Sequence, residues 1–227
     1  MAVNKYVRGK STQLTVNFKS KEFDCKGGSC KCSITRIDTK LVRKLQVLRN
    51  WTNKGITINS GNRCEKHNKA CGGSTSSYHL NTKGKAADIV VGGMTPAAVA
   101  KLAQEIGFTG IGCYNGTQGR FVHVDVRPSK YYWKNTKGKD VGCSGHGGTK
   151  KKCPYTLGTS TLRKGSKGNS VRAMQWILDW AGYDCNVDGD FGAKTEKVLK
   201  AFQKDMCLTV DGVAGGNSLT ALREIVS

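Results

Sequence analysis

The C-terminal part of the chain contains an internal repeat. The segment Val187-Asp188-Gly189-Asp190-Phe191-Gly192 recurs as Val210-Asp211-Gly212-Val213-Ala214-Gly215. In each copy the glycine favours a tight turn, and apolar residues at helical spacing follow it. Another helical pattern precedes the first turn, so residues 161–227 are predicted to form a small all-α domain of three helices. A calcium loop needs more oxygen ligands and a closing glutamate, so we interpret Asp188 and Asp190 as turn residues.

The preceding part of the chain has both helix and strand patterns. Asp38 or Thr39 can cap one helix, and Thr95-Pro96 can open another. Strands are predicted at residues 57–59, 87–91, 111–114 and 121–126. The predicted fold class is therefore α+β, with a central antiparallel sheet flanked by helices.

Three possible metal ligands lie in or near these strands: His79, Asp88 and His123. Alternation in residues 121–126 places three valines on one strand face, so His123 and Asp125 project from the other. Each ligand alone has an ordinary interpretation as a hydrogen-bonded histidine or a turn aspartate. Together, two imidazoles and one carboxylate leave zinc an open fourth position, which is typical of catalytic sites. The set indicates a hydrolase.

The ligands belong to a series of short motifs in a fixed order. These are Thr57-Ile58-Asn59-Ser60-Gly61-Asn62-Arg63, His67-Asn68, Gly72-Gly73, Ser77-Tyr78-His79, Gly84-Lys85-Ala86-Ala87-Asp88 and Phe121-Val122-His123-Val124-Asp125. Together they resemble the zinc D-alanyl-D-alanine carboxypeptidase family, which includes phage L-alanyl-D-glutamate endopeptidases, penicillin-insensitive murein endopeptidases and the hedgehog signalling fold. The resemblance implies that His79, Asp88 and His123 bind zinc. It also implies that Arg63 and Ser77 contact the substrate.

The chain departs from this family at the expected general base. Relatives often carry Glu or Asp three residues before the last histidine, but this chain has Arg120 there. Arginine cannot accept a proton at working pH. Asp125 is the best substitute, and we predict that it is the general base. The alternative is that Asp125 orients the ligand His123.

The C-terminal repeat resembles the three-helix peptidoglycan-binding domain found on many cell-wall hydrolases, including its Ala201-Phe202-Gln203 signature. Residues 1–133 are then predicted to form the zinc peptidase domain. Residues 134–160 contain few apolar residues and many Lys and Gly, so they are predicted to be a basic linker. We expect His146 in this linker to be exposed.

The net charge of +21 is unevenly distributed. Residues 1–160 carry 28 Lys or Arg and 8 Asp or Glu, whereas residues 161–227 carry 9 and 8. Such a basic field attracts anionic polymers. Peptidoglycan with its teichoic acids and nucleic acid are both candidates, but no nucleic-acid-binding module or aromatic stacking platform is visible. The predicted partner is therefore bacterial peptidoglycan, with no specific nucleic acid.

The ten cysteines leave several possibilities open. Their even number allows disulfides, and Cys64 with Cys71 is the most plausible pair. The cluster Cys25-x4-Cys30-x-Cys32 could instead bind a structural metal, although its spacing departs from paired zinc knuckles. We expect most of the thiols to be free and buried, as in a chain made in a reducing cytosol.

Residues 1–18 interleave basic and polar side chains without a continuous apolar core, so neither a signal peptide nor a membrane span is predicted. We expect a monomeric enzyme made in the cytoplasm that acts on the cell wall after release, as a phage or prophage endolysin does. The predicted activity is zinc-dependent hydrolysis of an amide bond in the stem peptide or crosslink of peptidoglycan, by an endopeptidase or a D,D-carboxypeptidase. The alternative, motivated by Arg120, is a noncatalytic cell-wall-binding or signalling protein that retains a zinc site.

Overall fold

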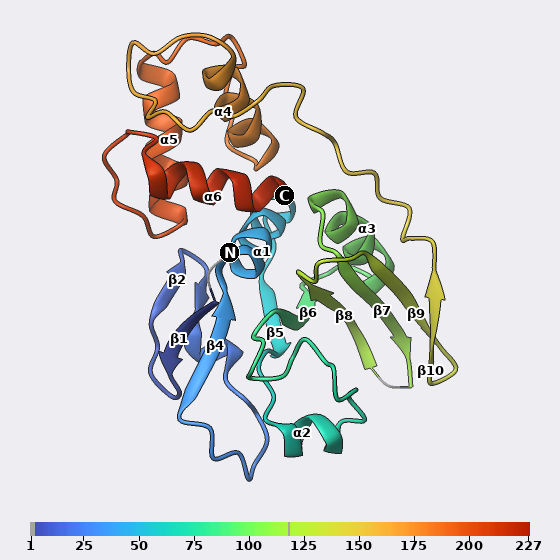
Figure 1. Cartoon of the computed structure of the whole chain (residues 1–227). Helices are drawn as coiled ribbons and strands as arrows, with labels where there is room; N and C mark the ends of the chain where they lie inside the picture. The colour runs from blue at the N-terminus through green and yellow to red at the C-terminus, as the bar shows by residue number, and fades with distance from the viewer. Residues whose placement is uncertain (1–2, 118) are drawn as a thin grey trace.

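The computed structural model describes residues 3–117 and 119–227 and contains a mixed α+β domain followed by a helical domain (Figure 1). The elements of the first domain are β1 (Val3–Val7), β2 (Gln13–Thr15), β3 (Phe18–Lys19), the 3₁₀ helix η1 (Ser20–Phe23), β4 (Ile34–Asp38), α1 (Thr39–Thr52), β5 (Ile56–Ser60), α2 (Glu65–Ala70), β6 (Ala86–Val91), α3 (Pro96–Ile106), β7 (Gly110–Gly116), β8 (Gly119–Asp125), β9 (Tyr131–Thr136) and β10 (Lys139–Cys143). The second contains α4 (Asn169–Trp180), α5 (Ala193–Asp205) and α6 (Gly216–Val226). No helix in residues 3–117 or 119–227 is both long and apolar enough to cross a membrane.

A six-stranded sheet forms the centre of the first domain, in the order β10-β9-β7-β8-β6-β5. The predicted α+β class is confirmed, and each predicted strand lies in this sheet. Neighbouring strands are antiparallel except for β7 and β9, which run parallel. The exception arises because β7 and β8 form a hairpin, after which the chain passes to the other side of β7. The register of β6 and β8 places Asp88 directly opposite His123.

The helices that cover the sheet begin where the sequence predicts. Asp38 caps α1, because its carboxylate accepts a hydrogen bond from the Lys40 amide at 2.9 Å. Thr95 caps α3, Pro96 occupies its first turn, and Gly107 ends it with a φ of 87°. Helix α3 packs on β7 and β8, and α1 packs on α3. These helices bury one face of the sheet and leave the other for a cleft.

The sheet extends further along the chain than the sequence suggests. Residues 134–143, expected in the linker, complete β9 and form β10 at the sheet edge. Exposed, Lys-containing edge strands have few apolar residues, which is why this hairpin resembles a linker in sequence. His146 is half-buried rather than exposed, since its Nε2 lies 3.2 Å from the carbonyl oxygen of Ile111. The irregular connection therefore begins after Cys143.

The repeat in the second domain produces two matching hydrogen-bond networks. The buried Gln175 amide donates to Asp188 Oδ1 at 2.7 Å, and its oxygen accepts from the Gly189 amide at 2.8 Å. One helix later, Gln203 does the same with Asp211 Oδ1 at 2.7 Å and the Gly212 amide at 2.9 Å. The aspartates are thus turn residues, and each turn is tied to the preceding helix.

The two domains pack directly against each other, with α6 in contact with α1 (Figure 1). The fully buried Lys44 of α1 donates through Nζ to the carbonyl oxygens of Ile106 and Ile225, each at 3.0 Å. Burial lowers the pKa of Lys44 well below its usual value. Trp51 Nε1 donates to the Trp180 carbonyl oxygen at 2.6 Å. The buried apolar cluster is therefore continuous across the two domains.

This packing predicts that a substitution in α6 destabilises the whole chain. Glu224 is buried and accepts hydrogen bonds from Arg43 and from Thr39 of α1. Replacing Glu224 with alanine should lower the free energy of unfolding by about 2 kcal/mol, because a buried charged hydrogen-bond partner is lost. Glu196→Ala is the control, since this half-buried residue pairs with Lys200 within α5 rather than with a residue of the first domain. Urea unfolding should remain a single transition, and separate melting of α4–α6 with an unchanged first domain would contradict the shared core.

Candidate metal centre and active site

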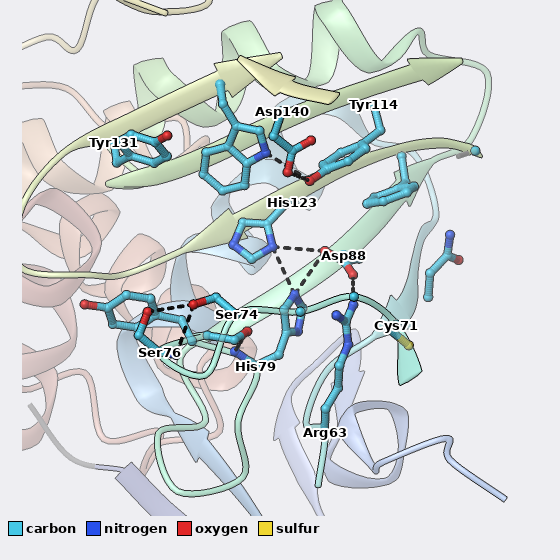
Figure 2. Close-up of a pocket in the computed structure, with 18 of the residues that line it drawn as sticks. Arg63, Cys71, Ser74, Ser76, His79, Asp88, Tyr114, His123, Tyr131 and Asp140 are labelled. Atoms are coloured by element: carbon cyan, nitrogen blue, oxygen red, sulfur yellow. Dashed lines mark hydrogen bonds and ion pairs between the residues drawn. The ribbon is translucent and has the colours of Figure 1, made fainter. Parts of the chain in front are cut away.

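Three polar side chains converge on the exposed face of the sheet (Figure 2). His79 comes from the loop before β6, Asp88 from β6 and His123 from β8. The His79 Nε2 atom lies 2.9 Å from His123 Nδ1 and 3.1 Å from Asp88 Oδ1, and His123 Nδ1 lies 3.0 Å from Asp88 Oδ1. All three residues are buried. The structure thus brings together the three ligands predicted from the sequence.

The other side of each imidazole is already occupied by a hydrogen-bond acceptor. His79 Nδ1 lies 2.7 Å from the carbonyl oxygen of Gly61, and His123 Nε2 lies 3.0 Å from Asp125 Oδ2. An N–H that donates outward leaves the opposite nitrogen's lone pair free for a metal. Two imidazole nitrogens and a carboxylate oxygen about 3 Å apart suit tetrahedral zinc, whose N and O ligands lie about 2.0–2.2 Å from the ion. The residues present therefore fit zinc.

Protonation of His123 should compete with zinc. Burial lowers the pKa of His123, but hydrogen bonds to Asp125 and Asp88 outweigh it and raise the pKa to about 9. Burial lowers the pKa of His79, which therefore stays neutral near neutral pH. Below pH 9 zinc must displace a proton from His123, so its affinity should fall as the pH is lowered.

We predict that NMR of the metal-free protein detects titration of the His123 ring near pH 9, and that zinc abolishes this titration. Asp125→Asn should move the His123 pKa downward, because the anionic acceptor is removed. Titration of His123 at the ordinary value of 6.5 in the metal-free protein would contradict this account.

Asp125 lies at the edge of the His123 ring that faces away from His79 and Asp88. Its carboxylate is fully buried and lies at the Nε2 edge of the His123 ring, away from Nδ1. Its Oδ1 also accepts from the Arg127 amide at 3.0 Å and from Arg127 Nε at 2.9 Å. The alternation correctly placed both residues on one strand face but could not give the ring orientation. This geometry favours the alternative given by the sequence, in which Asp125 orients the ligand His123.

Two glycines of β7 make room for this arrangement. Gly110 lies opposite Asp125 and Gly112 lies opposite His123 in the antiparallel pairing. A Cβ on Gly110 would lie 2.2 Å from the Asp125 carboxylate, and a Cβ on Gly112 would lie 2.3 Å from the Trp133 indole. Trp133 in turn packs 5.0 Å from the His123 ring. The pattern Gly-Ile-Gly was a sequence signal for this close approach.

The two residues predicted to contact substrate, Arg63 and Ser77, both line the cleft above the ligands. Arg63 forms an ion pair with Asp88 Oδ2, and its Nε donates to Ser60 Oγ at 2.8 Å. Ser77 Oγ accepts from the His79 amide at 3.2 Å. Both side chains therefore hold metal-ligand residues in place from the wall of the cleft.

The cleft has a volume of about 1060 Å³ and contains a carboxylate that the sequence interpretation had placed in the linker. Asp140 of β10 accepts from the Tyr114 hydroxyl at 2.8 Å and from Asn135 Nδ2 at 2.8 Å. Trp133 Nε1 donates to the same Tyr114 hydroxyl at 3.0 Å. Figure 2 shows Asp140 and Tyr114 on the wall beside His123. Among the described lining residues, only Asp88 and Asp140 carry carboxylates.

Aromatic and cationic groups form much of the remaining wall. The Arg127 guanidinium lies 4.8 Å from the Tyr78 ring centroid and 5.4 Å from those of Tyr131 and Trp133. Arg120, which replaces the expected acid, is exposed and also lines the cleft. This wall can bind a substrate with peptide groups and carboxylates, because it offers both stacking surfaces and cations.

A buried triad of N, N and O ligands on the floor of a cleft defines a candidate metallohydrolase, and comparison with known families agrees. Residues 16–125 match the family model for peptidase M15, and residues 167–222 match the model for a putative peptidoglycan binding domain. The chain therefore carries an M15 peptidase domain followed by a peptidoglycan-binding domain. This combination is that of a cell-wall peptidase.

Two solved structures show local similarity. The SleB N-terminal domain is 32% identical over 32% of this chain and 100% of that chain, with a TM-score of 0.31. A peptidoglycan-binding protein from Clostridioides difficile, in complex with glutamine hydroxamate, is 20% identical over 62% of this chain and 72% of that chain, with a TM-score of 0.28. At these TM-scores, neither structure defines the fold of the whole chain.

Proposed function

We propose that this protein is a zinc-dependent peptidoglycan peptidase that hydrolyses an amide bond in the stem peptide or crosslink of the bacterial cell wall. The observation that carries the proposal is the convergence of His79, Asp88 and His123 at 2.9–3.1 Å on the floor of an open cleft. Zinc bound there would act as a Lewis acid toward the scissile carbonyl and the attacking water.

The surrounding residues hold the ligands ready for this chemistry. Asp125 orients His123 through Nε2, the Gly61 carbonyl orients His79 through Nδ1, and Arg63 holds Asp88 through Oδ2. Arg63 also lines the cleft, where its cation suits a substrate carboxylate or carbonyl oxygen. Each ligand thus has an outer partner that limits its rotation.

We assign the proton transfer to Asp140. Asp88 is committed to the ligand set, so Asp140 is the remaining carboxylate among the described residues that line the cleft. Asp140 is exposed to the cleft solvent and is held by the Tyr114 hydroxyl and Asn135. Burial raises the pKa of Tyr114, which therefore remains a protonated donor to Asp140. Asp140 accepts the proton of the attacking water and later donates it to the leaving amine.

The second domain and the basic surface favour intact polymer as the substrate. A wall-binding module raises the local concentration of the catalytic cleft at the amide bonds of the wall. The basic first domain attracts anionic wall polymers. We therefore propose endopeptidase action over carboxypeptidase action. We further propose an endolysin role, in which the enzyme reaches the wall after its release from the cytoplasm.

Soluble peptidoglycan fragments distinguish the possible bonds. Fragments containing D-Ala-D-Ala, D-Ala to diamino acid or L-Ala-D-Glu bonds would be incubated with the zinc-loaded protein, and the products separated by mass. The proposal expects one bond to be cut, with cleavage blocked by a chelator and restored by zinc. Binding to wall fragments without cleavage of any of these bonds would favour a noncatalytic wall-binding protein.

A further inference from the structure

A second group of metal-ligand atoms lies outside the cleft, between the loop after η1 and the start of α2. The sulfur atoms of Cys25, Cys30 and Cys64 lie within 4.8 Å of one another. His67 Nδ1 lies 3.3 Å from Cys25 Sγ. All ten cysteines of the chain are free thiols. Three thiols and an imidazole are thus gathered without a disulfide among them.

Cys64 and Cys71, the most plausible pair if disulfides formed, are free thiols, in keeping with the expectation that most of the thiols are free. Cys64 and Cys71 are the N-cap and C-cap of α2. At a rise of about 1.5 Å per residue, their Cα atoms lie roughly 10 Å apart along the axis, beyond the span of about 7 Å that a disulfide permits. Helix α2 therefore directs Cys64 toward Cys25 and Cys30.

The spacing of this cluster suits tetrahedral zinc. With Zn–S distances of about 2.3 Å and Zn–N distances of about 2.0–2.1 Å, two sulfurs lie about 3.8 Å apart and a sulfur and a nitrogen about 3.6 Å apart. The sulfurs lie at most 4.8 Å apart, and His67 Nδ1 lies 3.3 Å from Cys25 Sγ, so the three thiols are near this spacing and His67 is the imidazole beside them. Zinc sites with three cysteines and one histidine are a common structural type.

Backbone amides already point at each sulfur. The Cys64 amide lies 3.3 Å from Cys25 Sγ, the Cys32 amide lies 3.5 Å from Cys30 Sγ, and the His67 amide lies 3.4 Å from Cys64 Sγ. Such N–H groups stabilise thiolate charge in metal sites. Each of the three sulfurs therefore accepts a backbone N–H that would stabilise its thiolate form.

Hydrogen bonds and close packing hold the loop after η1 in a conformation that places Cys25 and Cys30 near α2. Arg8 donates through its guanidinium to the carbonyl oxygens of Cys25 at 3.0 Å and Cys30 at 3.4 Å. A Cβ on Gly27 would lie 2.8 Å from His67 Cβ, so only glycine lets the loop pack on this histidine. The loop thus presents its sulfurs to His67 and Cys64 by close packing.

We propose that Cys25, Cys30 and Cys64, with His67 as the fourth ligand, bind a structural zinc ion distinct from the ion in the cleft. The ion fastens the loop after η1 to α2. Cys64 directly follows Arg63, which pairs with Asp88 in the cleft. The site therefore also restrains the segment that holds the cleft ligands.

Cobalt substitution tests this site through a sulfur-specific signal. The full chain would be purified with reductant, stripped of metal and titrated with Co²⁺. The wild type should develop an intense near-ultraviolet sulfur-to-cobalt charge-transfer band, saturating at one sulfur-bound ion per chain. The cleft ligands contain no sulfur, so His123→Ala should retain this band whether or not the proposed peptidase activity is correct.

Matched variants assign the ligands. Cys64→Ser should lose most of the band, whereas Cys71→Ser, at the other end of α2, and Cys32→Ser should retain it. His67→Ala should shift the visible cobalt spectrum, because nitrogen leaves the coordination sphere. Absence of the band in the wild type, or a native disulfide among Cys25, Cys30 and Cys64, would overturn the site. Both measurements use the wild-type protein, so neither requires a variant to fold. Loss of the band in Cys32→Ser with an unchanged His67→Ala spectrum would overturn His67 as the fourth ligand.

Discussion

Replacing His79 with alanine is expected to abolish wall hydrolysis and to remove the cleft metal. His79 Nε2 is one of three ligand atoms within 3.1 Å of one another, and the remaining two do not make the three-ligand set that a catalytic zinc site needs. Since Lewis-acid activation of the carbonyl contributes several kcal/mol, the hydrolysis rate should fall about a thousandfold or more. His146→Ala is the matched control, because this half-buried histidine lies outside the cleft. It follows β10 and contacts Gln104 of α3 and Ile111 of β7.

Metal analysis separates loss of zinc from loss of folding. The wild type should contain two zinc ions per chain, and His79→Ala should retain the thiol-bound ion with an unchanged circular dichroism spectrum. A His79→Ala protein that keeps its full metal content and hydrolytic rate would remove His79 from the proposed site.

Replacing Asp140 with asparagine is expected to lower kcat by about a hundredfold to ten-thousandfold while leaving the metal bound, because a general base contributes in this range. Asparagine keeps an oxygen acceptor for the Tyr114 hydroxyl, so the β10 wall should remain in place. The measurement is kcat on a soluble stem-peptide fragment at saturating zinc, together with zinc content.

Asp125→Asn is the comparison that distinguishes the two carboxylates. Because Asp125 orients His123 from behind, its loss should weaken zinc binding about tenfold to a hundredfold, and excess zinc should restore much of the activity. If Asp125→Asn lost all turnover with zinc fully bound while Asp140→Asn remained active, Asp125 rather than Asp140 would carry the proton.

The sequence predicts the grouping of His79, Asp88 and His123 because its signals are local. Alternation in β8 defines the face of His123, and Asp88 begins a run of buried apolar residues in β6. Those strands pair in the structure with Asp88 opposite His123. The repeated Asp-Gly turns likewise predict the helical domain, because each turn is closed by the preceding helix through Gln175 or Gln203.

Other features depend on contacts between distant segments, which no local pattern contains. Asp140 reaches the cleft because β9 crosses to pair with β7, and its polar hairpin resembles a linker in sequence. The thiol cluster joins Cys25 to Cys64 across 39 positions of the chain. The orientation of the His123 ring, which decides the role of Asp125, is set by packing against Trp133 over Gly112.

Digestion of purified bacterial cell walls is the most direct test of a zinc-dependent peptidoglycan peptidase. Walls would be incubated with the full chain, with the chain plus chelator, and with the chelated chain after zinc is restored, and the released fragments analysed by mass spectrometry. The account predicts new amine ends at one type of stem-peptide bond, lost with chelator and regained with zinc. Tight binding to several wall chemistries with no new amine ends in any sample would contradict it.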